Sequence, residues 1–228
     1  MSALSPIRGV IFDLDGTLLD TIDDIAEASN RVYGSRGLAP FSIDEMKSLV
    51  GEGAEELVRK AFAARGVAEP NGAGMAAIIR DYRREYESCW RAHSRPYAGV
   101  PELLGRLARR GIKTAVLSNK AQSFTDLMIT DLLPAHRFDL VRGALPGVPL
   151  KPDPAPALAI AAGLGIDPAH CAFVGDTSID MRTARAAGMF AVGALWGFRT
   201  SEELLSSGAE VLAASPEDVL GLLESRGQ

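Results

Sequence analysis

Short apolar runs alternate with amphipathic helical patterns along most of the chain, and each run ends in a polar cluster. This alternation is typical of a parallel β-sheet covered by helices. Runs of only a few residues suit strands that are buried on both faces. The sequence therefore predicts an α/β fold with a doubly wound, Rossmann-like core. The expected strands are residues 9–12, 113–117, 139–141, 172–174 and 191–194, and the expected helices are residues 100–110, 122–131, 155–162, 178–187, 202–207 and 216–224, the last capped by Ser215 with Pro216 as its first residue.

One region, between residues 21 and 95, interrupts this alternation of strands and helices. It contains no strand-like run, and its apolar residues recur at the three- and four-residue spacing of helices, as within residues 57–62. Because it enters directly after the first strand, it should lie above the carboxyl edge of the sheet, where open α/β proteins bind ligands. We therefore expect an α/β core domain of residues 1–20 and 96–228 and an inserted helical cap, residues 21–95, that serves as a lid.

The composition argues against several classes of partner. The chain has 228 residues, of which 47% are hydrophobic and 23% charged, and its 24 basic and 29 acidic side chains leave a net charge of -5. This balance gives no basic surface for nucleic acid. Residues 186–198, an uncharged stretch that no other in the chain exceeds in length, fall short of the roughly 20 residues that a membrane span needs.

The cysteines bear on the expected compartment. Cys89 and Cys171 lie far apart, with no metal-ligand spacing nearby, so neither a disulfide framework nor a zinc site is indicated. No secretory signal is evident. We expect a cytoplasmic protein, either a monomer or a homodimer, with no membrane partner.

Polar residues follow three of the expected strands. Asp13, Ser118 and Asp176 each stand where an apolar run ends. Any one of them alone would be an ordinary turn or capping residue. The carboxyl ends of parallel strands lie side by side, however, so we expect the three to meet in one crevice.

Clustered carboxylates indicate either a site for a divalent metal or a pair of nucleophile and acid. Asp13 and Asp15 are two residues apart and repel each other unless a cation or a proton lies between them. Gly16 would let the backbone approach a ligand closely, and its N–H could face an anion. Asp176 and Asp180 form a second pair near the start of a helix. Oxygen ligands without imidazole or thiolate favour Mg²⁺ over zinc.

Lys151 lies in the segment Pro149-Leu150-Lys151-Pro152-Asp153-Pro154. The prolines stiffen this segment, so the ammonium group can be held in one direction. Beside the carboxylates it would be a positive partner for phosphoryl oxygens and for Asp13.

Together these residues resemble the four motifs of the haloacid dehalogenase-like superfamily, in order and over nearly the whole chain. The motifs are Asp13-Leu14-Asp15-Gly16-Thr17, Ser118-Asn119, Lys151-Pro152 and Gly175-Asp176 with Asp180. An aspartate at position 15 is similar to the phosphatases of the superfamily and unlike its dehalogenases. Gly51-Glu52-Gly53 and residues 143–154 and 195–199 resemble phosphoglycolate phosphatases in particular.

The resemblance implies a Mg²⁺-dependent phosphatase that hydrolyses a small phosphorylated metabolite through an aspartyl-phosphate. Asp13 would be the nucleophile, Asp15 the general acid and base, and Lys151 a catalytic cation. Phosphoryl oxygens would be bound by Ser118, Asn119 and Lys151. The Mg²⁺ ligands would be Asp13, the backbone carbonyl of Asp15, Asp176 and Asp180.

The cap would supply selectivity. The Gly51-Glu52-Gly53 turn at a helix start could offer backbone N–H groups to a substrate carboxylate, as in 2-phosphoglycolate. Glu52 would repel that carboxylate unless its side chain points away, and Arg59 and Lys60 are further candidate partners.

The sequence is also compatible with other functions. A phosphomutase of the β-phosphoglucomutase type would return the phosphate to the same sugar, but no hexose-holding residues are identifiable between residues 21 and 95. A pyrophosphatase shares much of the pattern. A signalling receiver domain would need its acceptor aspartate on a middle strand and no insert, and a catalytically silent binding protein is disfavoured because no motif residue is missing.

Overall fold

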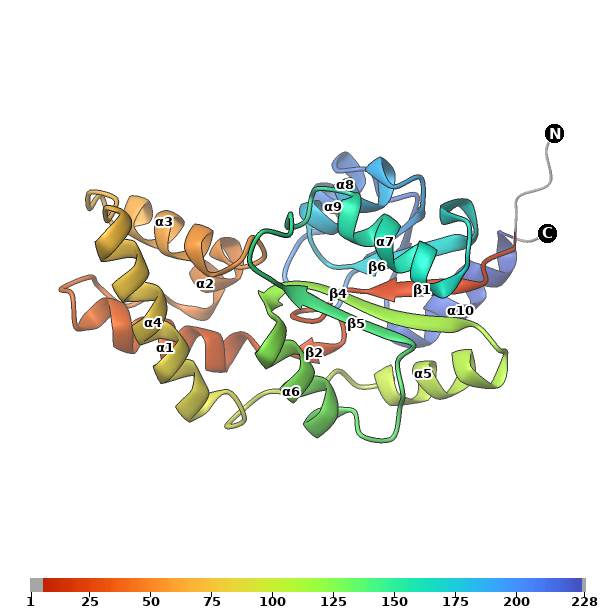
Figure 1. Ribbon diagram of the computed structural model, residues 1–228, viewed down its shortest axis with the longest axis horizontal. Coiled ribbons are helices and arrows are strands. Elements are labelled where there is room, and N and C mark those ends of the chain that lie inside the picture. The colour runs from red at the N-terminus through yellow and green to blue at the C-terminus, as the bar shows by residue number, and fades with distance from the viewer. Residues whose placement is uncertain (1–5, 227–228) are drawn as a thin grey trace. The chain divides into compact units, whose positions relative to one another are not determined.

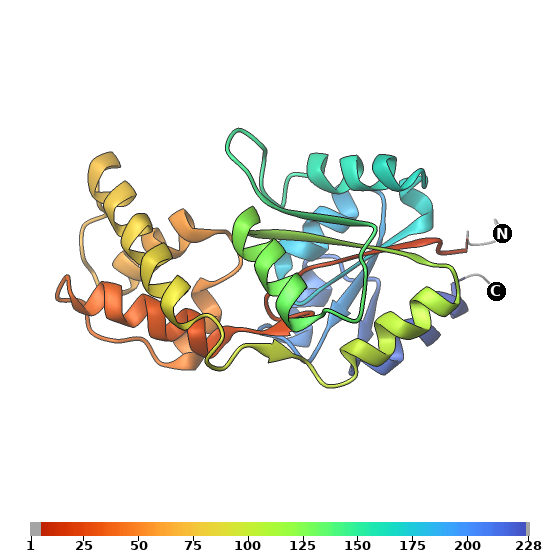
Figure 2. The same cartoon turned by 60° about the horizontal axis from the view of Figure 1, so that its bottom comes forward.

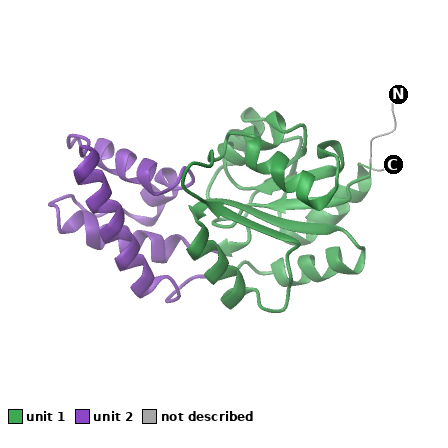
Figure 3. Ribbon diagram, viewed as in Figure 1, with its two compact units in different colours: residues 1–19, 96–228 green, residues 20–95 purple. Residues whose placement is uncertain are grey.

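The computed structural model describes residues 6–226, so residues 1–5 and 227–228 of the predicted core domain lie outside the described part. The chain forms two compact units, one of residues 20–95 and one of residues 1–19 and 96–228 (Figure 3). It passes from one unit to the other within β2 (Leu19–Asp20) and returns within β3 (Arg95–Pro96), and these two short strands pair with each other.

The larger unit contains a six-stranded sheet with the order β5-β4-β1-β6-β7-β8, in which every paired strand is parallel. The predicted α/β fold is therefore confirmed. The chain leaves β1 toward β4 on one side and later adds β6 on the other, so the end of β1 lies at the topological switch point. The strands are β1 (Gly9–Phe12), β4 (Lys113–Ala121), β5 (Leu140–Ala144), β6 (Cys171–Gly175), β7 (Phe190–Ala194) and β8 (Val211–Ala213).

Among the strands of this sheet, β4 and β8 differ most from the sequence prediction. The apolar run predicts an end at residue 117, but β4 continues to Ala121, so Ser118 lies inside the strand. The register with β5 shifts between Leu117 and Ala121, which marks an irregularity at this point. The sequence does not predict β8, because three apolar residues are too few to show the periodicity of a strand.

Helices cover both faces of this sheet. α7, α8 and α9 lie on one face, and α5, α6 and α10 lie on the other (Figures 1 and 2). On the first face, Ile11, Ala115 and Phe173 of the strands pack with Ile160 and Met181 of the helices in one buried core. The elements are α5 (Val100–Arg109), α6 (Gln122–Leu132), α7 (Ala155–Leu164), the 3₁₀ turn η1 (Pro168–His170), α8 (Ser178–Ala186), α9 (Ser201–Ser206) and α10 (Pro216–Ser225), the last with Ser215 as N-cap and Pro216 first, as predicted.

The smaller unit is helical. Its core includes Tyr33, whose ring meets those of Phe41 and Phe62 edge to face, a favourable arrangement of aromatic rings. The helices are α1 (Ile22–Gly34), α2 (Ile43–Leu49), α3 (Ala54–Ala64) and α4 (Gly72–Cys89), with α1 packed on α2 and α4 and α3 packed on α4.

A buried carboxylate ties the two ends of the smaller unit together. Asp24, fully buried near the start of α1, accepts hydrogen bonds from the backbone N–H groups of His93 and Ser94 and from the Ser94 hydroxyl.

Nowhere within residues 6–226 does a helix have both the length and the apolar character needed to cross a membrane.

Candidate active site

Three carboxylates meet at the carboxyl edge of the sheet. β1 pairs with β4 on one side and with β6 on the other, so the residues that follow these strands lie next to one another. Asp13, Asp176 and Asp180 each place a carboxylate oxygen within 4.8 Å of those of the other two. All three residues are at most 6% exposed. The structure thus brings together acids that are far apart in the sequence.

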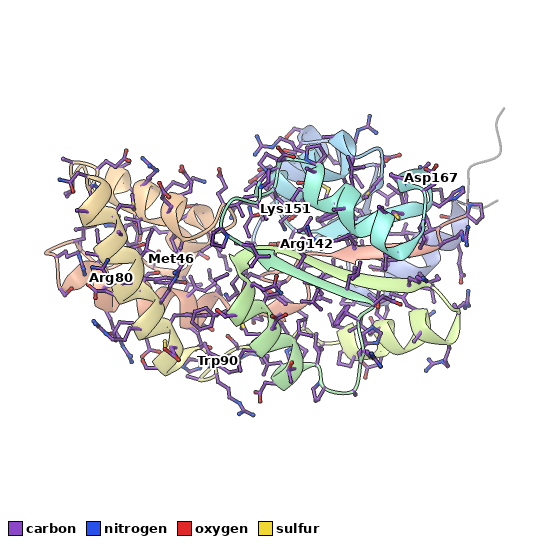
Figure 4. All side chains as sticks on the ribbon, in the orientation of Figure 1. Met46, Arg80, Trp90, Arg142, Lys151 and Asp167 are labelled. Atoms are coloured by element: carbon purple, nitrogen blue, oxygen red, sulfur yellow. The ribbon has the colours of Figure 1, made fainter. Side chains whose placement is uncertain are left out.

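Lys151 lies among these carboxylates. Its Nζ is 2.7 Å from Asp13 Oδ1 and 2.7 Å from Asp180 Oδ1. It belongs to the segment between β5 and α7 (Figure 4) and is only 3% exposed. Burial lowers the pKa of Lys151, but the charges of Asp13 and Asp180 outweigh burial and raise it. The ammonium therefore stays charged inside the protein.

The remaining electrostatics favour a cation. Burial and then the charge of Asp180 raise the pKa of Asp13 well above its usual value, in spite of Lys151. Burial and Asp180 also raise the pKa of Asp176 to about 7. Such shifts arise when like charges are crowded together away from water. A set of carboxylate oxygens with no imidazole or thiolate in the cluster fits Mg²⁺.

Asp180 holds its position through α8. Thr177 is the N-cap of this helix, and Asp180 Oδ2 accepts hydrogen bonds from Thr177 N at 3.0 Å and Thr177 Oγ1 at 2.6 Å. Because Thr177 and not Asp176 caps the helix, the carboxylate of Asp176 remains directed to the cluster.

Gly16 has a different role from the predicted one. Its N–H donates to the backbone oxygen of Leu19 at 2.8 Å, so the expectation that it faces an anion is wrong. Gly16 has a φ of +86°, and a Cβ there would lie 2.3 Å from Asp176 Oδ2. The close approach that this glycine permits is therefore to the Asp176 carboxylate.

Ser118 and Asn119 lie in the last part of β4, and both are buried. Asn119 Nδ2 donates to the backbone oxygen of Lys151 at 3.0 Å, and Lys151 N donates to Asn119 Oδ1 at 2.9 Å. The Asn119 side chain thus fixes the backbone of Lys151, a role that the sequence does not predict. Ser118 Oγ accepts a hydrogen bond from the backbone N–H of Lys120 at 3.1 Å.

The carboxylate of Asp15 contacts Lys120, a residue that the sequence motifs do not single out. Lys120 Nζ lies 2.9 Å from Asp15 Oδ1 and 3.2 Å from Asp15 Oδ2, and the two side chains are only 9% and 13% exposed. The available signal was the position of Lys120, directly after Ser118-Asn119 at the same sheet edge.

The predicted cap residues belong to the smaller unit. Gly51, Glu52 and Gly53 form the turn between α2 and α3, and both glycines have positive φ angles, +129° and +86°. Glu52 forms an ion pair with Lys60, and Arg59 forms one with Glu55 at 2.7 Å. The charges of Glu52, Arg59 and Lys60 are therefore already matched inside this unit.

The four motifs lie within a region that matches a known protein family. The sequence pattern of the haloacid dehalogenase-like hydrolase family matches residues 10–194, which include all of the clustered acids and Lys151. The protein belongs to the haloacid dehalogenase-like hydrolases.

This haloacid dehalogenase-like hydrolase is similar along its length to phosphoglycolate phosphatases. It is 32% identical over 210 residues to the phosphoglycolate phosphatase of Xanthomonas campestris pv. campestris, covering 92% of this chain and 93% of the relative. It is 34% identical over 183 residues to that of Thiobacillus denitrificans, covering 80% and 81%. The crystal structure of a predicted phosphoglycolate phosphatase from Haemophilus somnus 129PT superposes with a TM-score of 0.86 at 27% identity, covering 95% of this hydrolase and 97% of that chain.

Proposed function

We propose that this hydrolase is a Mg²⁺-dependent phosphatase that acts on small phosphomonoesters through an aspartyl-phosphate, with 2-phosphoglycolate as its preferred substrate. The observation that carries the proposal is the position of Asp13, at the switch point of the sheet, 2.7 Å from the buried ammonium of Lys151 and in a cluster of carboxylates. The similarity to phosphoglycolate phosphatases supports the choice of substrate.

In the first step Asp13 attacks the phosphorus, and the bond between phosphorus and the ester oxygen breaks. Asp15 gives a proton to the leaving alkoxide. In the second step Asp15 takes a proton from a water molecule, which attacks the aspartyl-phosphate and releases inorganic phosphate. A covalent carboxylate intermediate divides one difficult displacement into two easier ones. Lys120, paired with Asp15, keeps the Asp15 carboxylate in position.

Positive charge and hydrogen-bond donors would hold the phosphoryl group. Lys151 supplies charge beside Asp13, and the Ser118 hydroxyl lies in the same edge of the sheet. Bound Mg²⁺ would neutralise the phosphoryl oxygens and the nearby carboxylates. Asp13, the backbone carbonyl of Asp15 and Asp176 would hold the ion, with Asp180 helping either directly or through water.

We further propose that the smaller unit is the lid of this enzyme. Closure of a lid excludes water from the first step and selects the substrate. The Gly51-Glu52-Gly53 turn precedes α3 and would offer N–H groups to the substrate carboxylate. The ion pair with Lys60 neutralises Glu52 and so removes the repulsion that Glu52 would otherwise exert.

The test is a substrate panel with Mg²⁺: 2-phosphoglycolate, pyrophosphate, glucose 1-phosphate and an aryl phosphate. We expect the fastest phosphate release from 2-phosphoglycolate. Asp13→Asn should lower kcat by about 10³-fold or more without changing the circular dichroism spectrum. Asp126→Asn, at an exposed helical carboxylate, is the matched control.

Each alternative function has its own outcome in this panel. Formation of glucose 6-phosphate without release of phosphate would identify a phosphomutase. Preference for pyrophosphate would identify a pyrophosphatase, and release from no substrate would favour a binding protein. Full turnover by Asp13→Asn would show that Asp13 is not the nucleophile.

A further inference from the structure

We propose that residues 196–198, the loop after β7, are a positioning element that holds the Asp176 carboxylate in the orientation required by Mg²⁺. The inference rests on the proposed function, because it concerns the cation site of that mechanism. The loop comes from a different strand than any of the carboxylates, and nothing in the four motifs assigns it a role.

The first observation is how the Asp176 carboxylate is bonded. Phe198 N donates to Asp176 Oδ2 at 2.8 Å, and Thr17 Oγ1 donates to Asp176 Oδ1 at 2.9 Å. Each oxygen thus receives one hydrogen bond from an uncharged donor. An ionised carboxylate has about four lone-pair positions, so this pattern fixes the plane of the carboxylate and leaves lone pairs on both oxygens for a cation.

The second observation is the packing of Gly197. A Cβ at this position would lie 2.2 Å from Asp176 Cβ and 2.4 Å from the backbone oxygen of Gly16. Real Cβ atoms do not approach other atoms so closely, so any side chain here would have to displace Asp176 or the turn at Gly16. The loop therefore packs directly against Asp176 and against the backbone of the turn at Gly16.

The third observation links the loop to that turn. Trp196 Nε1 donates to the backbone oxygen of Thr17 at 2.9 Å. Thr17 in turn bonds Asp176, and Asp176 accepts from Phe198, so the contacts form a closed circuit from the loop through Thr17 and Asp176 back to the loop. Such a circuit restrains three segments at once, and outer contacts of this kind orient metal ligands in proteins.

Charge explains why Asp176 depends on this loop more than its neighbours do. Asp13 and Asp180 both form ion pairs with Lys151, which holds them directly. Asp176 instead accepts hydrogen bonds from Phe198 N and Thr17 Oγ1, which carry no charge. Arg199, next in the chain, pairs with Glu203 at 3.3 Å. The hydrogen bonds that orient the Asp176 carboxylate thus come from two uncharged donors.

Two substitutions separate positioning from simple packing. Trp196→Phe keeps an aromatic ring but removes the indole N–H, and Gly197→Ala adds the clashing methyl group. Trp90→Phe, in the smaller unit, and Gly221→Ala, in α10 where an added Cβ meets no atom within 4 Å, are the matched controls. Mn²⁺ is the probe, because its binding is measured by electron paramagnetic resonance without any substrate.

We expect Gly197→Ala to weaken Mn²⁺ binding by about 10- to 100-fold and Trp196→Phe by about 10-fold, the range found when outer contacts of a metal site are removed. The apparent KM for Mg²⁺ in the phosphatase assay should rise in parallel, with kcat at saturating Mg²⁺ changed much less. Both controls should bind Mn²⁺ as the unaltered protein does. If Gly197→Ala fails to fold, Trp196→Phe decides the question alone.

The possible failures are distinguishable. If the unaltered protein binds Mn²⁺ and both variants bind it equally well while only their metal-free unfolding midpoints fall, the loop has a packing role and the inference is wrong, although the proposed phosphatase function stands. If the unaltered protein binds no Mn²⁺, the metal-dependent function itself fails and this inference fails with it.

Discussion

The Lys151 ammonium lies 2.7 Å from Asp13 Oδ1, and the two side chains are only 1% and 9% exposed. The same ammonium is 2.7 Å from Asp180 Oδ1. One buried cation therefore offsets two buried anions, and the removal of one partner from a buried ion pair leaves charge that neither water nor protein compensates. Lys151 thus supports the fold of the larger unit as well as the proposed chemistry.

Lys151→Met should lower the free energy of unfolding by about 3–5 kcal/mol, because Asp13 and Asp180 lose their shared cation. Urea denaturation with a chelator present measures this loss, and Mg²⁺ should restore part of it. Lys47→Met is the control: Lys47 pairs with the exposed Asp44 at 3.5 Å, and such pairs contribute about 0–1 kcal/mol. Equal, small effects of both substitutions would contradict the assignment of Lys151 as the buried counter-charge.

Asp15→Asn should affect the two proposed steps differently. An aryl phosphate has a good leaving group that needs little acid catalysis, so Asp13 should still be phosphorylated. Hydrolysis of the aspartyl-phosphate, which needs the general base, should slow by about 10²- to 10⁴-fold. Rapid mixing should therefore show a burst of about one equivalent of phenolate, followed by slow turnover. A steady rate with no burst would mean that Asp15 does not act in the second step.

Stabilisation by Mg²⁺ should increase with pH. The pKa of Asp176 is about 7 in the folded protein against an ordinary value of 3.8, because of burial and the charge of Asp180. Between these values the metal-free native state binds more protons than the unfolded chain, so the free energy of unfolding falls as pH rises through this window. A bound cation needs Asp176 in its ionised form, and the charge of the cation offsets the repulsion between the Asp176 and Asp180 carboxylates.

The melting temperature with Mg²⁺ minus that with a chelator should therefore be larger near pH 8 than near pH 6. Asp126→Asn, far from the cluster in the chain and exposed, should keep the same trend, whereas Asp176→Asn should lose most of the shift. A shift that is equal at both pH values, or larger near pH 6, would rule out Asp176 as a ligand that must lose a proton.

The sequence was sufficient to predict the convergence of Asp13 with Asp176. Their meeting depends only on strand order and on the rule that parallel strand ends share one edge, and apolar runs reveal both strands. The pairing of Lys120 with Asp15 was not predictable in this way. It joins side chains 105 positions apart, and no periodicity specifies which of the neighbouring polar residues a lysine contacts.

Gly16 shows a second limit. A glycine after a strand indicates that some group approaches the backbone, but not which group. The structure shows that the group is the carboxylate of Asp176, and that the Gly16 N–H bonds Leu19 within the same turn. The hydrogen bond from Trp196 to Thr17 is not indicated by the sequence either, because it joins residues 179 positions apart. Contacts between loops depend on side-chain geometry that a sequence pattern does not contain.

Asp24 should be a main determinant of the stability of the smaller unit. Its carboxylate is fully buried and accepts hydrogen bonds from three donors, His93 N, Ser94 N and Ser94 Oγ. Asp24→Ala would leave these donors, of which the two of Ser94 are buried, without this partner. Because each such donor costs about 1–3 kcal/mol, we expect faster hydrogen exchange in α1 and in residues 93–95, with slower exchange retained in the sheet of the larger unit. Asp23→Ala, in the same turn but more exposed, should change exchange little. If both substitutions leave exchange unaltered, Asp24 does not hold the ends of this unit together.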